Sequence, residues 1–187
     1  MDVLELIEAQ LEKNDRLIAG VADEKLSAPT PCAQFDVRAL MNHMVVANHF
    51  FVSVASGQPM EGAGDEVPEV LGDDPAIAHG QSAVELMKTL REPGVQERTF
   101  NFGFAQMPAA MGLGLMLTET TVHGWDLAKA AGGDTSIDAD VATMLLQGSQ
   151  GIDAMRSPEG NPFGPAVEVP ETASPGDRLV AFLGRTP

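Results

Sequence analysis

Four stretches of this chain place apolar residues at the three- and four-residue spacing of an α-helix, and loops rich in Gly and Pro separate them. The first stretch, for example, sets Leu4, Ile7 and Leu11 against a side that carries acidic residues. Amphipathic helices are stable when their apolar faces pack against one another. The sequence therefore predicts an all-α fold, a four-helix bundle. The four helices are expected from the N-terminus to Gly20, from Asp36 to about Ser56, from Pro75 to Arg91, and from near Pro108 to Ala131.

Three shorter features complete the expected architecture. Phe100, Phe102 and Phe104 alternate with polar residues or Gly, which predicts a short extended segment near 98–105 with its phenylalanines in the core. A further helix is expected over about 137–155 and a short C-terminal helix over about 177–183. Residues 57–74 form a loop rich in Gly, Pro and acidic residues. The length of 187 residues suits a single domain, 1–187.

Charge and hydropathy exclude several classes of partner. The chain has 11 Lys and Arg against 27 Asp and Glu, a formal net charge of −16, which disfavours nucleic acid and anionic membrane surfaces. Two uncharged runs, Ala39–Met60 and Thr99–Thr118, reach the length of a membrane span but contain Asn, His, Gln or Pro, so we interpret them as core segments. The start of the chain does not resemble a targeting signal.

A single cysteine, Cys32, excludes an internal disulfide and any site built from several cysteines. One thiol in an acidic globular chain fits the reducing cytoplasm. Cys32 follows a proline-rich turn and has no base nearby in sequence, so a buried, inert thiol is favoured over a nucleophile.

The most informative residues are polar ones at positions where the helical pattern calls for apolar ones. His43 shares a helix face with core residues, and so does Glu119, with His123 one turn further along. A buried carboxylate is costly unless it is paired or binds a metal. Imidazole and carboxylate are ligands for zinc and similar divalent ions, so the candidate metal ligands are Glu119, His123 and, from a facing helix, His43. The same spacing is also typical of a structural hydrogen-bonded pair.

The two remaining histidines are weaker candidates. His49 lies about 120° around the helix from His43, so a regular helix cannot direct both side chains to one metal. His79 stands in a polar stretch next to Gly80, and we expect it to be exposed to solvent.

Two segments resemble a known family. Thr30-Pro31-Cys32, followed by Phe35, Val37, Leu40 and His43, resembles the T-P-C-x-x-W-x-V-x-x-L-x-x-H segment of the DinB-like superfamily, with Phe35 in place of Trp. Glu119, followed by His123-Gly124-Trp125-Asp126-Leu127-Ala128, is similar to the E/D-x-x-x-H-G-W-D-L-A helix of the branch that includes the mycothiol-dependent maleylpyruvate isomerase metal-binding domain. The tail from Phe163 to Arg185 also resembles short members of this branch.

The resemblance implies a DinB-like bundle that binds a divalent metal, zinc being the first candidate, through His43, Glu119 and His123. It implies mycothiol as a cosubstrate, and hence an enzyme that activates a low-molecular-weight thiol for transfer to a small electrophile, a thiol S-transferase. Asp126 is expected either to orient a ligand histidine or to serve in packing or capping. Because the isomerase has a second domain that contributes to its active site, maleylpyruvate isomerisation is not expected for this chain.

Two further expectations follow from this interpretation. The alternative function is a non-catalytic helical bundle that binds a metal or a small ligand. The expected partners are a small thiol and a small electrophile, and helix faces of such a bundle allow a homodimer.

Overall fold

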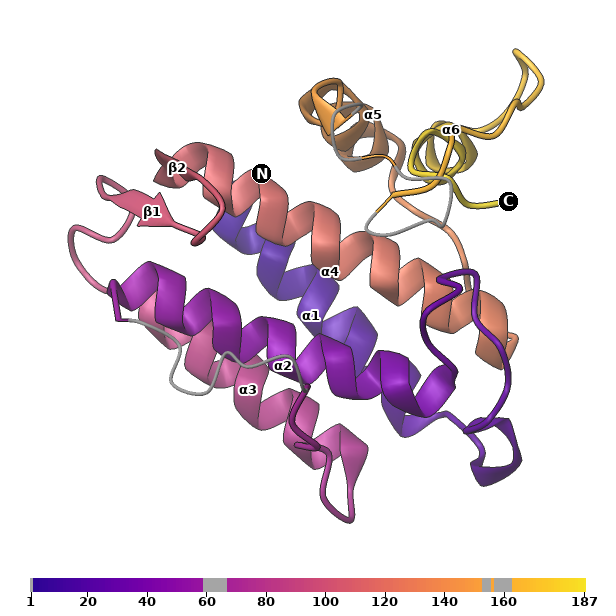
Figure 1. The fold of residues 1–187 in the computed structure, drawn as a ribbon, viewed down its shortest axis with the longest axis horizontal. Helices are drawn as coiled ribbons and strands as arrows, with labels where there is room; N and C mark the ends of the chain where they lie inside the picture. Colours follow the sequence, from indigo (N-terminus) through magenta and orange to yellow (C-terminus); the bar gives the residue numbers. More distant parts are fainter. Residues whose placement is uncertain (1, 59–66, 153–155, 157–162) are drawn as a thin grey trace.

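The computed structural model describes residues 2–58, 67–152, 156 and 163–187, and it confirms the all-α expectation (Figure 1). Each of the four long helices lies within a few residues of its predicted bounds. Asp36 caps the second helix through a 2.8 Å bond from the Ala39 amide, and Gly132 ends the fourth with a left-handed φ of 81°. The four helices are α1 (Val3–Ala19), α2 (Val37–Ser56), α3 (Pro75–Leu90) and α4 (Ala109–Ala131).

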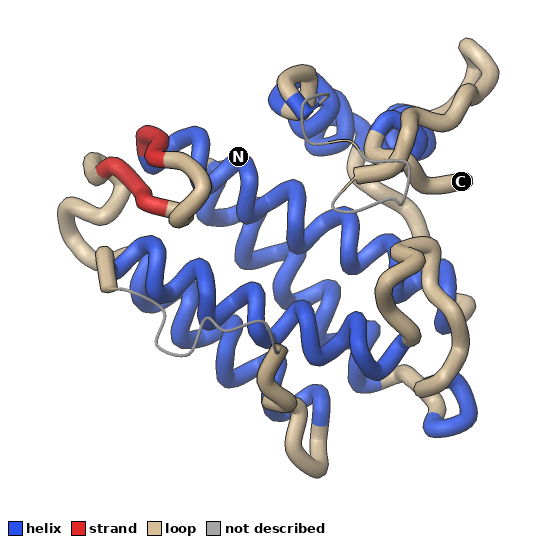
Figure 2. The backbone as a smooth tube through the Cα atoms, viewed as in Figure 1, coloured by secondary structure: helices blue, strands red, loops and turns tan. Residues whose placement is uncertain are grey.

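These four helices pack as a bundle in which α1 contacts α3 and α4, and α2 contacts the same two helices from the other side. Figure 2 shows them as the main body of the molecule, with the loops and the C-terminal elements at its edges. Among the described residues, no helix is both long enough and apolar enough to cross a membrane. A one-turn 3-10 helix, η1 (Asp23–Lys25), lies in the connection from α1 to α2.

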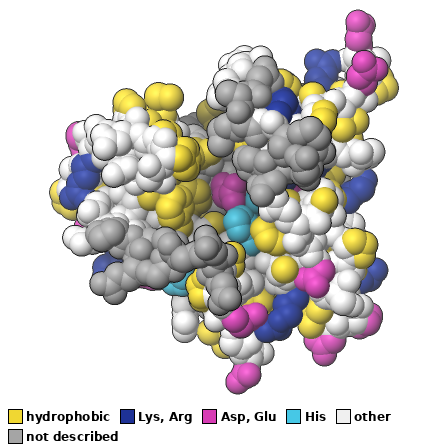
Figure 3. Space-filling view, viewed as in Figure 1, with side chains coloured by type: hydrophobic (Ala, Val, Ile, Leu, Met, Phe, Trp, Pro, Cys, Tyr) yellow, Lys and Arg dark blue, Asp and Glu magenta, His cyan; other side chains and the backbone are white. Residues whose placement is uncertain are grey.

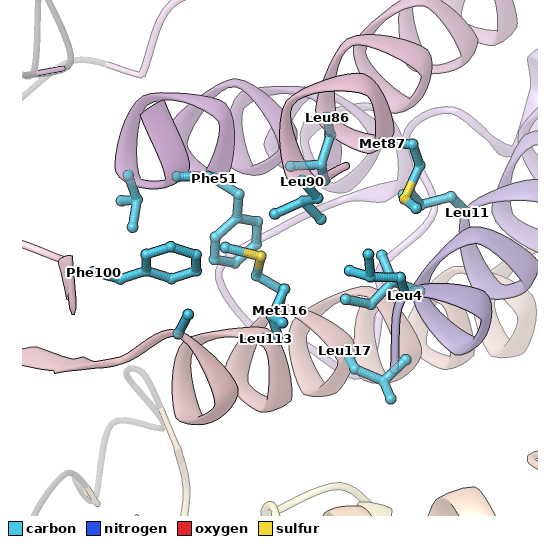
Figure 4. Close-up of a cluster of buried hydrophobic side chains, with 14 of the residues drawn as sticks. Leu4, Leu11, Phe51, Leu86, Met87, Leu90, Phe100, Leu113, Met116 and Leu117 are labelled. Atoms are coloured by element: carbon cyan, nitrogen blue, oxygen red, sulfur yellow. The ribbon is translucent and has the colours of Figure 1, made fainter. Parts of the chain in front are cut away.

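The core lies between the helices, where side chains from all four point toward one another (Figure 4). Leu86 and Leu90 of α3 are fully buried, as are Leu113 and Met116 of α4. Burial of each such side chain contributes about 1.5–3 kcal/mol to folding. Packing of this kind fixes the relative positions of α2 and α4, the helices that carry the candidate ligands.

The extended segment is a two-stranded antiparallel hairpin of β1 (Thr99–Asn101) and β2 (Gln106–Pro108), with Phe100 opposite Met107. Phe100 and Phe102 are buried, as predicted. The prediction for Phe104 was wrong, because its side chain is 66% exposed. Phe104 lies in the turn between the strands, after Gly103 with its φ of 82°, so the alternation of the strand does not extend to it.

The C-terminal part forms α5 (Ala139–Gly148) and α6 (Pro175–Phe182), which pack on each other beside α4. The prediction of a helix to residue 155 was wrong: α5 ends at Gly148, and residues 149–152 are not α-helical. Gly148 and Gly151 have poor helix propensity, which explains the early end. Residues 153–155, part of the 57–74 loop (59–66) and part of the tail (157–162) lie outside the described residues.

Two glycines on one turn of α4 give a matched test of the packing. A Cβ atom at Gly112 would lie 2.5 Å from Cδ2 of Phe100, whereas a Cβ at Gly114 would meet no atom within 4 Å. Gly112→Ala should lower the free energy of unfolding by about 1–3 kcal/mol through overpacking. Gly114→Ala should raise it by about 0.5–1 kcal/mol, because Ala favours a helix over Gly. Urea unfolding measures both, and equal effects would contradict the packing described here.

Candidate metal centre

The structure brings His43 of α2 together with Glu119 and His123 of α4. One ligand atom from each of the three side chains lies within 4.8 Å of the other two. Helical periodicity puts Glu119 and His123 on one face of α4, and the packing of α2 against α4 places His43 opposite them. Figure 3 shows histidine and acidic side chains meeting at the surface near the centre of one face of the molecule.

Both histidines approach the same carboxylate oxygen. Nε2 of His43 lies 2.9 Å from Oε1 of Glu119, and Nε2 of His123 lies 3.2 Å from it. The side chains of His43 and Glu119 are 27% and 29% exposed, and His123 is buried. The three groups therefore converge at a point that is enclosed on one side and open on the other.

Asp126 fixes the ring of His123 from behind. Its Oδ2 lies 3.1 Å from Nδ1 of His123, so the imidazole presents Nε2 to Glu119. Arg185, near the C-terminus, donates from Nε and Nη2 to the two oxygens of Asp126 at 3.3 and 3.1 Å. Of the two roles expected for Asp126, the geometry favours orientation of the histidine. The contribution of Arg185 has no local sequence signal, because its partner lies 59 residues away.

The Thr-Pro-Cys segment shapes the open side of the site. The Thr30 hydroxyl donates to the carbonyl oxygens of Cys32 and Phe35 at 2.9 and 2.8 Å, which holds this loop in a compact turn before α2. The loop stacks the Phe35 ring on His43, with centroids 4.8 Å apart. Cys32 is buried, as expected, and it forms a second close group with His123 and Asp126.

A cavity of about 170 Å³ opens beside the three candidate ligands. Its apolar walls come from Phe35, Leu115, Val122 and Phe163, and its polar lining includes Cys32, Gln34, Thr118 and Arg185. A small molecule in this cavity would contact His43, Glu119 and His123 directly.

The other two histidines lie outside this group. His49 is partly exposed on α2, with Nδ1 3.5 Å from Glu85, and it does not belong to the group of His43, Glu119 and His123. The prediction that His79 is exposed was wrong: it is 1% exposed, and its Nδ1 lies 2.5 Å from Oδ1 of Asp15. The partner is on α1, 64 residues away, so the polar local sequence gave no sign of it.

The charges in the site shift the pKa values of Glu119 and His123. Burial by itself would raise the pKa of Glu119, but the charge of His123 and hydrogen bonds from His123 and His43 outweigh it and hold that pKa far below its usual range. Burial by itself would lower the pKa of His123, but Glu119 and Asp126 raise it to about 10. A metal that takes Nε2 of His123 must therefore displace a proton at neutral pH.

The donor set fits a divalent transition ion. Two histidines and one glutamate are a known ligand set of catalytic zinc sites, which keep a further position open for water or substrate. Here the donors come from two facing helices, and the cavity adjoins them. The orientation of His123 by Asp126 supplies the outer hydrogen bond that metal-bound histidines usually make.

The fold and this group of side chains define a DinB-like helical bundle with a candidate metal site. The chain belongs to the mycothiol maleylpyruvate isomerase N-terminal domain family, whose model matches residues 7–128, from α1 through most of α4. Two uncharacterized proteins of Mycobacterium tuberculosis, from two strains, are each 31% identical to it over 172 residues, 91% of this chain and 90% of theirs. No solved structure gives a significant match.

The raised pKa of His123 predicts how the stability of the metal-free protein depends on pH. A folded pKa of about 10, above the ordinary 6.5, stabilises the fold fully below about pH 6.5, and this contribution is lost as the pH rises toward 10. Urea unfolding in the presence of a chelator should show the decline, and His123→Gln should flatten it. His49→Gln, a change at a partly exposed histidine, should leave it in place. A wild-type stability that is flat over this range would contradict the assignment.

The buried pair of Asp126 and Arg185 predicts a large mutational effect. Arg185→Met removes the guanidinium that donates to both oxygens of the fully buried Asp126 and leaves only His123 beside it, so it should lower the free energy of unfolding by about 3–5 kcal/mol. Arg16→Met removes an exposed arginine on α1 and should change it by less than about 0.5 kcal/mol. Equal losses in the two variants, measured by urea unfolding, would show that the pair does not contribute as described.

Proposed function

We propose that this protein is a divalent-metal-dependent enzyme, with zinc as the metal, that activates a low-molecular-weight thiol of the mycothiol type for transfer to a small electrophile. His43, Glu119 and His123 would hold the metal. The observation that carries the proposal is the convergence of these three side chains beside a cavity large enough for a small substrate. Membership of a mycothiol-associated family supports mycothiol as the thiol.

A bound zinc ion would act as a Lewis acid that lowers the pKa of a coordinated thiol, so that the sulfur is a thiolate at neutral pH. The sulfur would then form a bond to the electrophilic carbon, the leaving group would depart with its bonding electrons, and the thiol proton would pass to solvent. A cytoplasmic location suits this chemistry, because thiols there stay reduced.

The residues around the site have distinct roles in this proposal. Asp126 accepts a hydrogen bond from Nδ1 of His123 and so keeps Nε2 directed to the metal position. Phe35 stacks on His43 and limits its rotation. The apolar side chains of the cavity exclude water from the reacting sulfur and carbon, which favours transfer over hydrolysis of the electrophile.

The geometry also bears on the alternative, a non-catalytic bundle that binds a metal or a small ligand. A purely structural metal site is closed by protein ligands. The single cysteine, Cys32, forms a close group with His123 and Asp126 but not with His43 and Glu119. The group of His43, Glu119 and His123 keeps the cavity on its open side, which favours the enzyme.

The proposal predicts catalysis of a simple alkylation. Zinc-loaded protein with mycothiol and iodoacetamide should form the thioether about 100-fold faster than the uncatalysed reaction, measured by mass spectrometry of the product. Glu119→Gln should lose this acceleration, because a neutral amide is a poor ligand for a divalent ion. His49→Gln is the matched control and should retain it. No acceleration by the wild-type protein would sink the proposal.

A further inference from the structure

Three side chains among the described lining residues of the cavity can carry a positive charge, Arg185, His43 and His123, and each already lies against a carboxylate of the protein. Arg185 is buried, and its guanidinium donates to both oxygens of Asp126 and to the carbonyl of Leu183. The salt bridge with Asp126 therefore commits this arginine to the protein. A carboxylate entering the cavity would find it engaged.

No further Lys, Arg or His is among the described residues that line the cavity. The segments outside the described residues, 1, 59–66, 153–155 and 157–162, contain no Lys, Arg or His, and their charged residues are acidic. Arg156 lies over the ring of Phe182, 4.7 Å from its centroid, and donates to the carbonyl of Gly164 rather than lining the cavity. The net charge of −16 adds a long-range repulsion for anions.

The remaining lining suits an uncharged molecule. Phe35, Leu115, Val122 and Phe163 supply apolar surface, and Gln34 and Thr118 are polar but neutral. A cavity of about 170 Å³ holds a body the size of a benzene ring, since an apolar protein cavity of about 150 Å³ binds benzene. An unpaired anion beside these walls would lose hydration without gaining a partner.

We propose that this cavity takes an uncharged electrophile with a compact apolar or aromatic body, and that it rejects carboxylates. That the ligand is an electrophile rests on the proposed function. That the ligand is uncharged rests on the cavity alone. A divalent ion, the Glu119 carboxylate and one thiolate together carry no net charge. The second substrate therefore meets a neutral site in the working state.

A matched pair of unreactive probes tests this selectivity. Benzamide and benzoate have nearly the same shape and differ in charge, and ligand-observed NMR measures their affinities for the full chain. Benzamide should bind about tenfold more tightly than benzoate to the metal-free protein. It should also do so in zinc-loaded protein saturated with 2-mercaptoethanol, an uncharged thiol that prevents benzoate from reaching the metal. Benzoate binding as tightly as benzamide to the metal-free protein, or binding of neither probe, would overturn the inference.

The two arms separate this inference from the proposed function. A preference for benzamide in the metal-free protein, together with no binding of 2-mercaptoethanol after zinc loading, would remove thiol activation and leave the neutral cavity. Binding of 2-mercaptoethanol after zinc loading, without a preference for benzamide over benzoate, would support thiol activation and remove the neutral cavity.

A variant that adds a positive charge at the mouth of the cavity tests whether charge selects the ligand. Gln34 is exposed and lines the cavity, so Gln34→Lys adds an uncommitted cation without disturbing the core. It should shift the benzamide-to-benzoate ratio at least about fivefold toward benzoate, whereas Gln34→Met, of similar length and without charge, should keep the wild-type ratio. The same ratio in all three proteins would show that charge at this cavity does not select its ligand.

Discussion

The carboxylate of Glu119, held between two histidine rings inside a helical bundle, is the constraint on which the rest of the site depends. A carboxylate on the inner side of α4 costs folding free energy unless cations or hydrogen bonds compensate it. His43 from α2 and His123 from α4 supply that compensation, and both direct Nε2 to one oxygen. The interaction therefore joins α2 to α4 at this point of the bundle, and it brings together the three side chains proposed to bind a metal.

A second buried interaction extends this constraint to the end of the chain. Arg185 neutralises Asp126, and Asp126 in turn orients His123. The family match ends at residue 128, so Arg185 lies outside the matched region while acting on its site. The same salt bridge neutralises Arg185 beside the cavity, so the orientation of His123 and the proposed exclusion of carboxylates have one physical cause.

The sequence predicts the helices because each has local sequence signals: apolar spacing, a cap such as Asp36 and a terminating Gly such as Gly132. It predicts His43, Glu119 and His123 for a related reason, since polar residues stand out on an apolar helical face. Burial of a polar side chain by a partner far away in the sequence has no such local signal. His79 is buried where it contacts Asp15 on α1, and Arg185 is buried where the segment after α6 reaches Asp126 on α4.

The central claim is that the three converging side chains bind a divalent metal, and elemental analysis of untagged protein tests it most directly. The account predicts about one zinc or similar ion per chain, lost in both His43→Ala and His123→Ala. His49→Ala, a change at a partly exposed histidine on the same helix as His43, should retain the ion. Wild-type protein without metal after loading with excess zinc, or equal metal content in all the variants, would contradict the account.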